Sequence, residues 1–462
     1  MNPVFRPLRE LADSVRTRRV SPVFLTETFL DRLERLGPRY NAVVTLTRDR
    51  ALTEARRAEG EIAVGRWRGP LHGIPYGAKD LLATGGGIPT TWGAAPLRAQ
   101  TFDRDATVIR RLEEAGAVLV AKLSMVELAG GMGYRQPNAS FTGPGISPWG
   151  GAWSGGSSSG SGSAVGAGLV PFAIGSETWG SILSPAANCG VTGLRPTYGR
   201  VSRHGAMALC WTLDKLGPLA LTADDCGLVL DAIAGPDRHD PTAASRSYNY
   251  DASEVVGRRF RFGVIRDVIE PAEPPVREAF ERSLDVLRKI GTVEEVTLAD
   301  LPYEAIARTI LLSEAASAFE DMIESGTIGE LTAPEDRYQA YARDTILAKD
   351  YIKALRLRGR VVREADRVLS RFDALVAPSR SAAPPPLDRD FSATQRPLRD
   401  PMGAIGNLAG LPAVAVPNGF TEDGRAISLQ FMGRAWDENT VLAAGRAWQG
   451  ITDWHLRRPP VD

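Results

Sequence analysis

The sequence predicts an α/β fold in which a mixed β-sheet is sandwiched between α-helices. One observation is that short apolar runs with the composition of buried strands recur along the chain. A second is that helix-periodic segments separate these runs, so that strand and helix signals alternate. The clearest strand-like runs are residues 117–123 (AVLVAKL), 260–265 (FRFGVI), 374–378 (ALVAP) and 413–417 (AVAVP).

Three other segments follow from local composition. Residues 1–60 are charged and helix-periodic, which predicts an N-terminal helical segment. Residues 301–372 are helix-rich, and their basic stretch 355–363 (LRLRGRVVR) is predicted to be a solvated helix face. Residues 379–401 are rich in proline and predict a long surface loop near the site, for which a role as a lid stays open.

Charge and motif content exclude several classes of function. The 462 residues carry 55 basic and 55 acidic side chains, so no net field attracts nucleic acid or a membrane surface. No phosphate loop, H-E-x-x-H or C-x-x-C motif is present, and we therefore expect no metal and no cofactor. Cys189, Cys210 and Cys226 are predicted to be buried, reduced residues. With no apolar stretch typical of a signal peptide or a membrane span, the expected location is the cytoplasm.

The most informative feature is a pair of serine-bearing turns rich in glycine. The first is the run 155–163 (GGSSSGSGS), and the second is 175–186 (GSETWGSILSPA). Glycine lets backbone N–H groups approach a ligand closely, as an oxyanion hole requires. A flexible linker has a similar composition. The linker interpretation is disfavoured because the next residues, 164–174 (AVGAGLVPFAI), are almost entirely apolar and predicted to be buried.

These segments resemble the amidase signature hydrolases. Residues 155–202 are similar to the defining segment of that family along their whole length, and residues 73–93 (GIPYGAKDLLATGGGIPTTWG) resemble its lysine-bearing segment. Residues 21–46 and 407–420 (NLAGLPAVAVPNGF) also fit, so the resemblance covers nearly the whole chain. No polar linker separates these segments, and the resemblance implies one amidase signature domain over residues 1–462. In the family, the stretch equivalent to 301–372 helps to shape the substrate funnel.

The resemblance implies a catalytic triad of Lys79, Ser157 and Ser181. Ser181 would be the nucleophile, Ser157 the bridging residue after a cis peptide bond, and Lys79 the base. A serine hydroxyl becomes a good nucleophile only when a base can take its proton. Because a free lysine has a pKa of about 10.4, Lys79 must lie in a pocket that lowers its pKa.

Each triad residue also has an ordinary structural interpretation. Lys79 followed by Asp80 is typical of a surface ion pair. Ser157 is a residue type that caps helices, and a helix is suggested by the apolar residues 164–170. Ser181 is compatible with a plain loop serine.

The family's oxyanion hole would fall on the backbone amides of Thr178, Trp179, Gly180 and Ser181. The sequence departs from the common family pattern around this loop. Glu177 replaces an aspartate, Trp179 replaces the first of two glycines, and Leu183 and Ser184 stand where an arginine is often found. Losing that arginine removes a partner for a substrate carboxylate, which favours neutral, apolar or aryl substrates.

A competing motif is the nucleophile elbow G-x-S-x-G, matched by Gly156, Ser158 and Gly160. The elbow requires a strand before it and a histidine and an acid downstream. The preceding residues 142–154 read as loop. His204, His239 and His455 follow in the chain, but their sequence context marks them, like His72, as structural or surface residues.

The sequence therefore predicts a serine hydrolase that cleaves C–N bonds of small neutral amides through an acyl-enzyme, as a monomer or homodimer. Carbamate (urethane) and ester hydrolysis stay open because the same tetrahedral intermediate serves all three bonds. One alternative is the glutaminase subunit of a tRNA-dependent amidotransferase. Another is a catalytically inactive binding protein on the same fold, which the intact Lys79, Ser157 and Ser181 disfavour.

Overall fold

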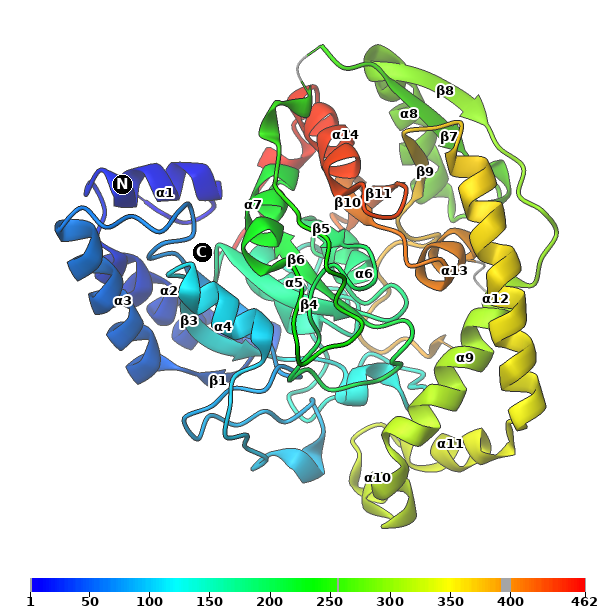
Figure 1. The fold of residues 1–462 in the computed structure, drawn as a ribbon, viewed down its shortest axis with the longest axis horizontal. Coiled ribbons are helices and arrows are strands. Elements are labelled where there is room, and N and C mark those ends of the chain that lie inside the picture. Colours follow the sequence, from blue (N-terminus) through cyan, green and yellow to red (C-terminus); the bar gives the residue numbers. More distant parts are fainter. Residues whose placement is uncertain (1, 256, 392–399, 462) are drawn as a thin grey trace.

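One eleven-stranded mixed sheet forms the centre of the protein (Figure 1). The computed structural model describes residues 2–255, 257–391 and 400–461. The order across the sheet is β1-β3-β2-β4-β6-β5-β10-β11-β9-β7-β8. The strands are β1 Val43–Leu46, β2 Pro75–Lys79, β3 Val118–Leu123, β4 Phe172–Glu177, β5 Thr192–Arg195, β6 Lys215–Ala220, β7 Phe260–Val264, β8 Gly291–Glu295, β9 Ala374–Pro378, β10 Ala413–Phe420 and β11 Ala426–Met432.

Helices flank this sheet, so the predicted fold class is confirmed (Figure 1). Helices α5 and α6 pack on each other and on the central strands, while α7, α8 and α14 form a second group against the sheet. The α-helices are α1 Leu8–Arg16, α2 Pro22–Leu36, α3 Arg48–Ala63, α4 Thr107–Glu114, α5 Ser159–Gly166, α6 Leu183–Asn188, α7 Ala223–Ile233, α8 Pro274–Ile290, α9 Tyr303–Ala318, α10 Glu320–Glu324, α11 Asp336–Ala342, α12 Ala348–Leu369, α13 Pro401–Leu408 and α14 Glu438–Gly450.

The four strand-like runs of the sequence are strands β3, β7, β9 and β10. The sheet is mixed because β2 pairs parallel with β3 and β4, whereas β4 pairs antiparallel with β6. The N-terminal segment is mostly helical, as predicted, but it also contains the edge strand β1. Four partly exposed residues, VVTL, are too short a pattern to separate from the helical periodicity on either side.

The glycine- and serine-rich run is part of the core, so the linker interpretation is wrong. Helix α5 begins at Ser159 and is buried along its whole length. Small residues are required there, since a Cβ on Gly160 would lie 2.5 Å from the carbonyl oxygen of Ala42. The helix therefore starts earlier than the apolar residues 164–170 suggest, because close packing outweighs the low helix propensity of glycine and serine.

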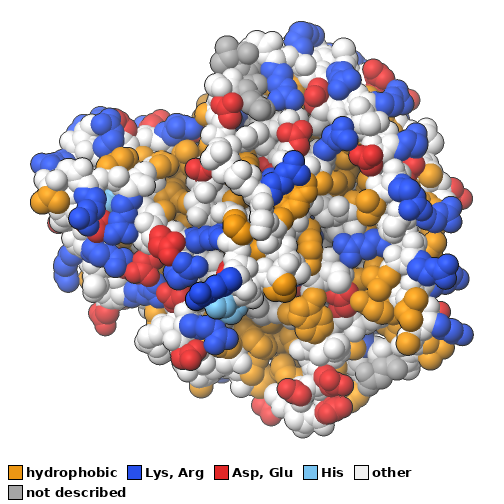
Figure 2. Space-filling model, in the orientation of Figure 1, with side chains coloured by type: hydrophobic (Ala, Val, Ile, Leu, Met, Phe, Trp, Pro, Cys, Tyr) orange, Lys and Arg blue, Asp and Glu red, His pale blue; other side chains and the backbone are white. Residues whose placement is uncertain are grey.

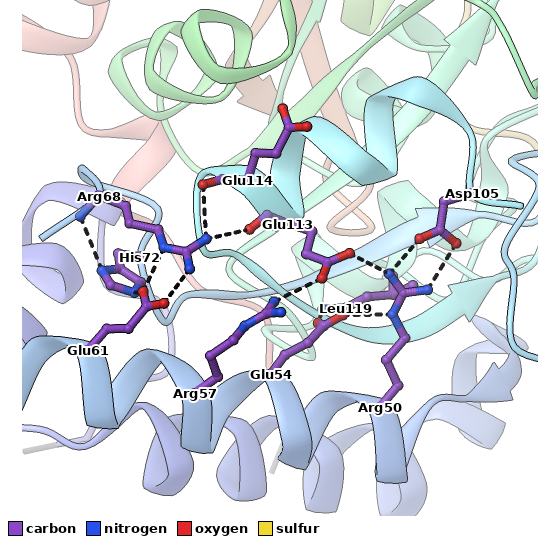
Figure 3. Close-up of polar contacts among 10 residues, drawn as sticks. All are labelled: Arg50, Glu54, Arg57, Glu61, Arg68, His72, Asp105, Glu113, Glu114 and Leu119. Atoms are coloured by element: carbon purple, nitrogen blue, oxygen red, sulfur yellow. Dashed lines mark hydrogen bonds and ion pairs between the residues drawn. The ribbon is translucent and has the colours of Figure 1, made fainter. Parts of the chain in front are cut away.

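Ion pairs fix helix α3 to the neighbouring strand and helix (Figure 3). Arg50 binds both carboxylate oxygens of Asp105, at 3.0 and 2.8 Å, and Nε of Arg50 donates to Glu54. Glu54 in turn accepts a hydrogen bond from the amide of Leu119 in β3 at 2.9 Å. Arg57 of the same helix pairs with Glu113 in α4 at 3.0 Å. Charged side chains of α3 thus attach this helix to β3 and to the region of α4.

The basic stretch 355–363 lies in α12, as a solvated helix face. Arg356, Arg360 and Arg363 are exposed. Figure 2 shows Lys and Arg side chains gathered along the edge of the molecule where α12 runs in Figure 1. The opposite side of α12 packs on α9 and α13. One main hydrophobic core extends in sequence from Leu8 to Val461. No helix in the described part of the chain is both long and apolar enough to cross a bilayer.

Candidate active site

Lys79 ends strand β2 inside the protein, fully buried. Its Nζ lies 2.7 Å from Oγ of Ser157, 3.0 Å from Oγ of Ser158 and 2.9 Å from Oγ of Ser176. Burial lowers the pKa of Lys79 well below its usual value, and the charges of Asp214 and Glu177 oppose this only in part. A neutral amine surrounded by hydroxyl groups can accept a proton from one of them.

The interpretation of Lys79 and Asp80 as a surface ion pair is wrong. Both side chains are buried, and Asp80 pairs with Lys122 at 3.1 Å instead. Asp80 also accepts a hydrogen bond from the amide of Thr91 at 2.9 Å. Successive residues at a strand end point to opposite faces of the sheet, so neighbours in sequence serve two different clusters.

Ser157 follows a cis peptide bond from Gly156, as the resemblance implied. It does not cap α5, because the residue at the N-cap is Ser158 and no side-chain cap bond is made there. The carbonyl oxygen of Ser181 accepts a hydrogen bond from the amide of Ser158 at 3.3 Å. Gly155 has a φ of +83°, and a Cβ there would lie 3.0 Å from the backbone of Ser184. The two serine-bearing turns are therefore packed directly against each other.

Ser181 lies in the turn between β4 and α6, with 8% of its surface exposed. Gly180 before it has a φ of +81°, a left-handed conformation that favours glycine. In the part of the chain that the structure describes, no group accepts a hydrogen bond from the four amides of residues 178–181. These amides are thus available to an oxyanion at the cavity wall, where residues 178–181 lie.

The buried side chain of Glu177 stabilises the turn that carries Ser181. Its carboxylate accepts hydrogen bonds from the amides of Ile182 and Leu183 at 2.9 and 3.1 Å. Its other oxygen pairs with Arg195 at 2.9 Å, and both side chains are fully buried. Burial alone would raise the pKa of Glu177, but Arg195 and Lys215 beside it hold that pKa below its usual range. With glutamate in place of the aspartate of the common family pattern, position 177 therefore still supplies a charged carboxylate that binds the backbone of the Ser181 turn.

Replacing Arg195 by methionine is expected to lower the free energy of unfolding by about 3–5 kcal/mol, because it leaves the Glu177 carboxylate buried without its partner. Urea unfolding would measure the loss. Arg16→Met is a matched control, since Arg16 pairs with Asp13 in an exposed i, i+3 bridge, and it should cost less than about 1 kcal/mol. Equal losses in the two variants would contradict a structural role for the buried pair.

A cavity of about 360 Å³ opens beside Ser181. Aromatic and aliphatic side chains form much of its wall, and Tyr134 and Trp153 pack edge to face with ring centroids 6.1 Å apart. The apolar lining residues are Ala129, Tyr134, Trp153, Trp179, Leu209, Val268, Leu311, Leu312, Ala377, Pro378 and Met402. The cavity thus offers an apolar surface next to a hydroxyl and free amides.

Sequence reasoning missed the charged residues of this cavity, Arg308, Arg343, Arg380 and Asp400. Arg308 comes from α9, in the helix-rich region 301–372. Arg380 lies two residues after the end of the buried strand β9, and this position close to a strand end is a signal that could have pointed to it. Residues 379–381 of the proline-rich loop line the cavity, while its residues 392–399 lie outside the described residues.

The nucleophile-elbow interpretation is wrong. The residues before Ser158 form turns and bends rather than a strand. Ser158 is buried, and its hydroxyl lies against Lys79 and the backbone of Ser176. His204 and His239 stack on each other, with ring centroids 4.9 Å apart. These two rings line a second, smaller cavity, which shares Ala129, Thr178 and Leu209 with the first. In the part of the chain that the structure describes, neither histidine makes a hydrogen bond to Ser158.

The three cysteines are buried and unbridged, as predicted. Within residues 2–255, 257–391 and 400–461, the side chains of His, Cys, Asp and Glu form no cluster suited to a metal ion.

Comparison with known proteins places the chain in a family of hydrolases. The family model described as Amidase matches residues 24–442. The chain is 37% identical to a glutamyl-tRNA(Gln) amidotransferase subunit from Chloroflexus aggregans over 96% of its length and 95% of that protein. The chain belongs to the amidase family, whose members carry the amidase signature.

Solved structures agree with this assignment. The native peptide amidase from Stenotrophomonas maltophilia is similar with a TM-score of 0.82 and 30% identity, covering 98% of both chains. A bacterial aryl acylamidase of the amidase signature family has a TM-score of 0.84 and covers 98% of this chain and 97% of its own. At 24% identity, this second likeness shows the shared fold alone.

Proposed function

We propose that this chain hydrolyses amides, with Ser181 as nucleophile, Ser157 as the bridging proton carrier and Lys79 as base. The observation that carries the proposal is the buried Lys79 amine, 2.7 Å from the Ser157 hydroxyl and without an acidic hydrogen-bond partner among the described residues. Burial shifts such an amine toward its neutral form, and a neutral amine can act as a general base. We propose that it acts in the cytoplasm on a small molecule, as a monomer or homodimer.

In the reaction we propose, Oγ of Ser181 attacks the amide carbonyl while its proton passes through Ser157 to Lys79. The negative charge on the carbonyl oxygen is stabilised by the amides of residues 178–181. Protonated Lys79 then returns the proton through Ser157 to the leaving nitrogen, and the C–N bond breaks. Water then attacks the acyl group on Ser181 while its proton passes to Lys79. Lys79 returns this proton through Ser157 to Oγ of Ser181 as the bond between Oγ and the acyl carbon breaks, and the carboxylic acid is released.

We propose neutral apolar or aryl amides as the preferred substrates. The aromatic and aliphatic wall of the cavity supports this choice, as does Leu183 in the place of the arginine that follows the nucleophile in many family members. Helix α9 contributes Arg308, Leu311 and Leu312 to the wall, which supports a role for the region 301–372 in guiding substrate to Ser181. Carbamates and esters are also candidates, since they pass through the same tetrahedral intermediate.

Steady-state hydrolysis of a matched aryl amide, aryl carbamate and aryl ester by the purified chain tests the proposal. We expect turnover of the aryl amide, and the kcat/KM values of the amide, the carbamate and the ester would rank the three bond types. The arginines of the cavity make an anionic substrate an informative fourth member of the set. If succinamate, a dicarboxylate monoamide, were preferred over the aryl amide, the proposed neutral specificity would be wrong.

A second candidate is the glutamine-hydrolysing subunit of a tRNA-dependent amidotransferase. It is favoured by the 37% identity to a glutamyl-tRNA(Gln) amidotransferase component over nearly the whole chain. The departures at Trp179 and Leu183 count against it. Turnover of simple amides by the chain alone would favour the self-sufficient hydrolase, while glutaminase activity that appears only with partner subunits would favour the amidotransferase.

A further inference from the structure

Trp179 lies two residues before Ser181, in the position of the first of two glycines in the common family pattern, and its indole is part of the cavity wall. The side chain is half-buried and packs against the main core. Its Nε1 donates a hydrogen bond to Oδ2 of Asp400 at 2.8 Å. This hydrogen bond directs the side chain of Trp179 toward Asp400, which also lines the cavity.

Asp400 is the single acidic side chain on the cavity wall among the described residues. Its Oδ1 accepts a hydrogen bond from the amide of Gly403 at 2.9 Å, at the start of helix α13. Its Oδ2 is the acceptor for Trp179. Burial raises the pKa of Asp400, while Trp179, the Gly403 amide and the charges of Arg380 and Arg195 oppose that rise. Oδ1 of Asp400 thus accepts a hydrogen bond at the start of helix α13, and Oδ2 accepts one from the indole of Trp179.

We propose that Trp179 is a specificity-determining residue, which excludes ammonium-bearing and bulky substrates by covering the carboxylate of Asp400 and filling the space beside Ser181. This inference rests on the proposed amide hydrolysis. Asp400 is half-buried, and a partly desolvated carboxylate on a cavity wall attracts a cationic group of a ligand when its oxygens are free. The indole N–H takes one acceptor position of Oδ2 and the Gly403 amide takes one of Oδ1, so a substrate ammonium would regain less hydrogen bonding at this carboxylate than the water it loses.

The test compares three 4-nitroanilides that differ only in the acyl group: butanoyl, 4-aminobutanoyl and 4-phenylbutanoyl. We expect Trp179→Phe, which keeps an aromatic ring but removes the N–H donor, to lower the neutral-to-ammonium ratio of kcat/KM at least about tenfold. Trp179→Gly should show the same change and also accept the phenylbutanoyl substrate. Trp153→Phe is the matched control, because the Trp153 indole lines the same cavity and its N–H has no partner in the described structure. Its neutral-to-ammonium ratio should stay that of the wild type.

A binding measurement separates failure of this inference from failure of the proposed function. Calorimetric titration with butanamide and 4-aminobutanamide in the Ser181→Ala background needs no turnover. We expect Trp179→Phe to tighten binding of the ammonium-bearing amide about tenfold relative to the neutral one, and added salt to weaken that gain. An unchanged binding preference would overturn the role of Trp179, even if all anilides were hydrolysed. A changed binding preference, together with no hydrolysis of any anilide by the protein with Ser181 intact, would support the role of Trp179 and overturn the hydrolase assignment.

Discussion

Ser181→Ala is expected to lower kcat for amide hydrolysis by about 10⁴-fold or more, because it removes the atom that would form the acyl-enzyme. KM should change little, since the apolar wall and the amides of residues 178–181 remain. The change removes one hydroxyl at an 8% exposed position, so the fold should be retained. Steady-state kinetics and thermal unfolding of the purified variant would measure both effects.

Ser184→Ala is the matched control for this experiment. Ser184 lines the same cavity three residues later, and its hydroxyl is buried without a partner among the described residues. We expect this variant to keep kcat within about tenfold of the wild type, since no hydrogen bond of the described structure is lost.

Phenylmethylsulfonyl fluoride should sulfonylate the wild type and Ser184→Ala at Ser181, with loss of fluoride. Turnover that survives in Ser181→Ala would mean that another residue is the nucleophile, and absence of turnover in the wild type would favour a binding protein or a partner-dependent subunit.

The local features of the sequence predicted the fold class and several strands. Strands β3, β9 and β10 lie where apolar runs are bounded by turn residues, because burial on both faces leaves a nearly continuous apolar pattern. Strand β7 was also predicted, although its Arg261 is exposed. Strand β1 was not predicted, since Val43–Leu46 is a short, partly exposed edge strand. The start of helix α5 could not be fixed from the apolar residues 164–170, because its first turn is made of serine and glycine, which only tertiary packing makes helical.

The candidate site was predicted in part. The sequence pointed to Lys79, Ser157 and Ser181 through resemblance, and the structure brings Lys79 within 2.7 Å of Ser157 and places Ser181 on the adjoining turn. The direction of the Trp179 side chain could not be predicted, because it depends on Asp400, which lies 221 positions away. Contacts between distant segments are decided by packing, and a single sequence carries no local signal for them.

The burial of Lys79 also could not be deduced from its neighbour Asp80. Two buried lysines pair differently at this end of the sheet: Lys122 lies 3.1 Å from a carboxylate oxygen of Asp80, whereas Lys79 faces hydroxyl groups alone within hydrogen-bond distance in the described structure. This difference in hydrogen-bond partners affects how far each amine is shifted toward its neutral form. A lysine with a carboxylate partner is stabilised in its charged form, while one without such a partner is shifted toward the neutral amine.

Lys79→Met is expected to lower kcat/KM about 10²–10⁴-fold, the usual contribution of a general base. The pH dependence identifies the base. Only neutral Lys79 can accept the serine proton, so kcat/KM of the wild type should rise about tenfold per pH unit below the pKa of Lys79 and level off above it. Because burial lowers that pKa well below its usual value, the plateau should begin at a lower pH than a free lysine would allow. In Lys79→Met this rising limb should disappear.

Lys215→Met tests whether the limb belongs to Lys79. Lys215 is also fully buried, on strand β6, and burial together with the charge of Arg195 lowers its pKa to about 7. Its Nζ donates to the carbonyl oxygen of Leu213 rather than to a serine. If Lys79 is the base, Lys215→Met keeps the rising limb even if its activity falls. A limb that persists in Lys79→Met and vanishes in Lys215→Met would instead place the ionisation on β6, so that the buried amine beside Ser157 would not be the base.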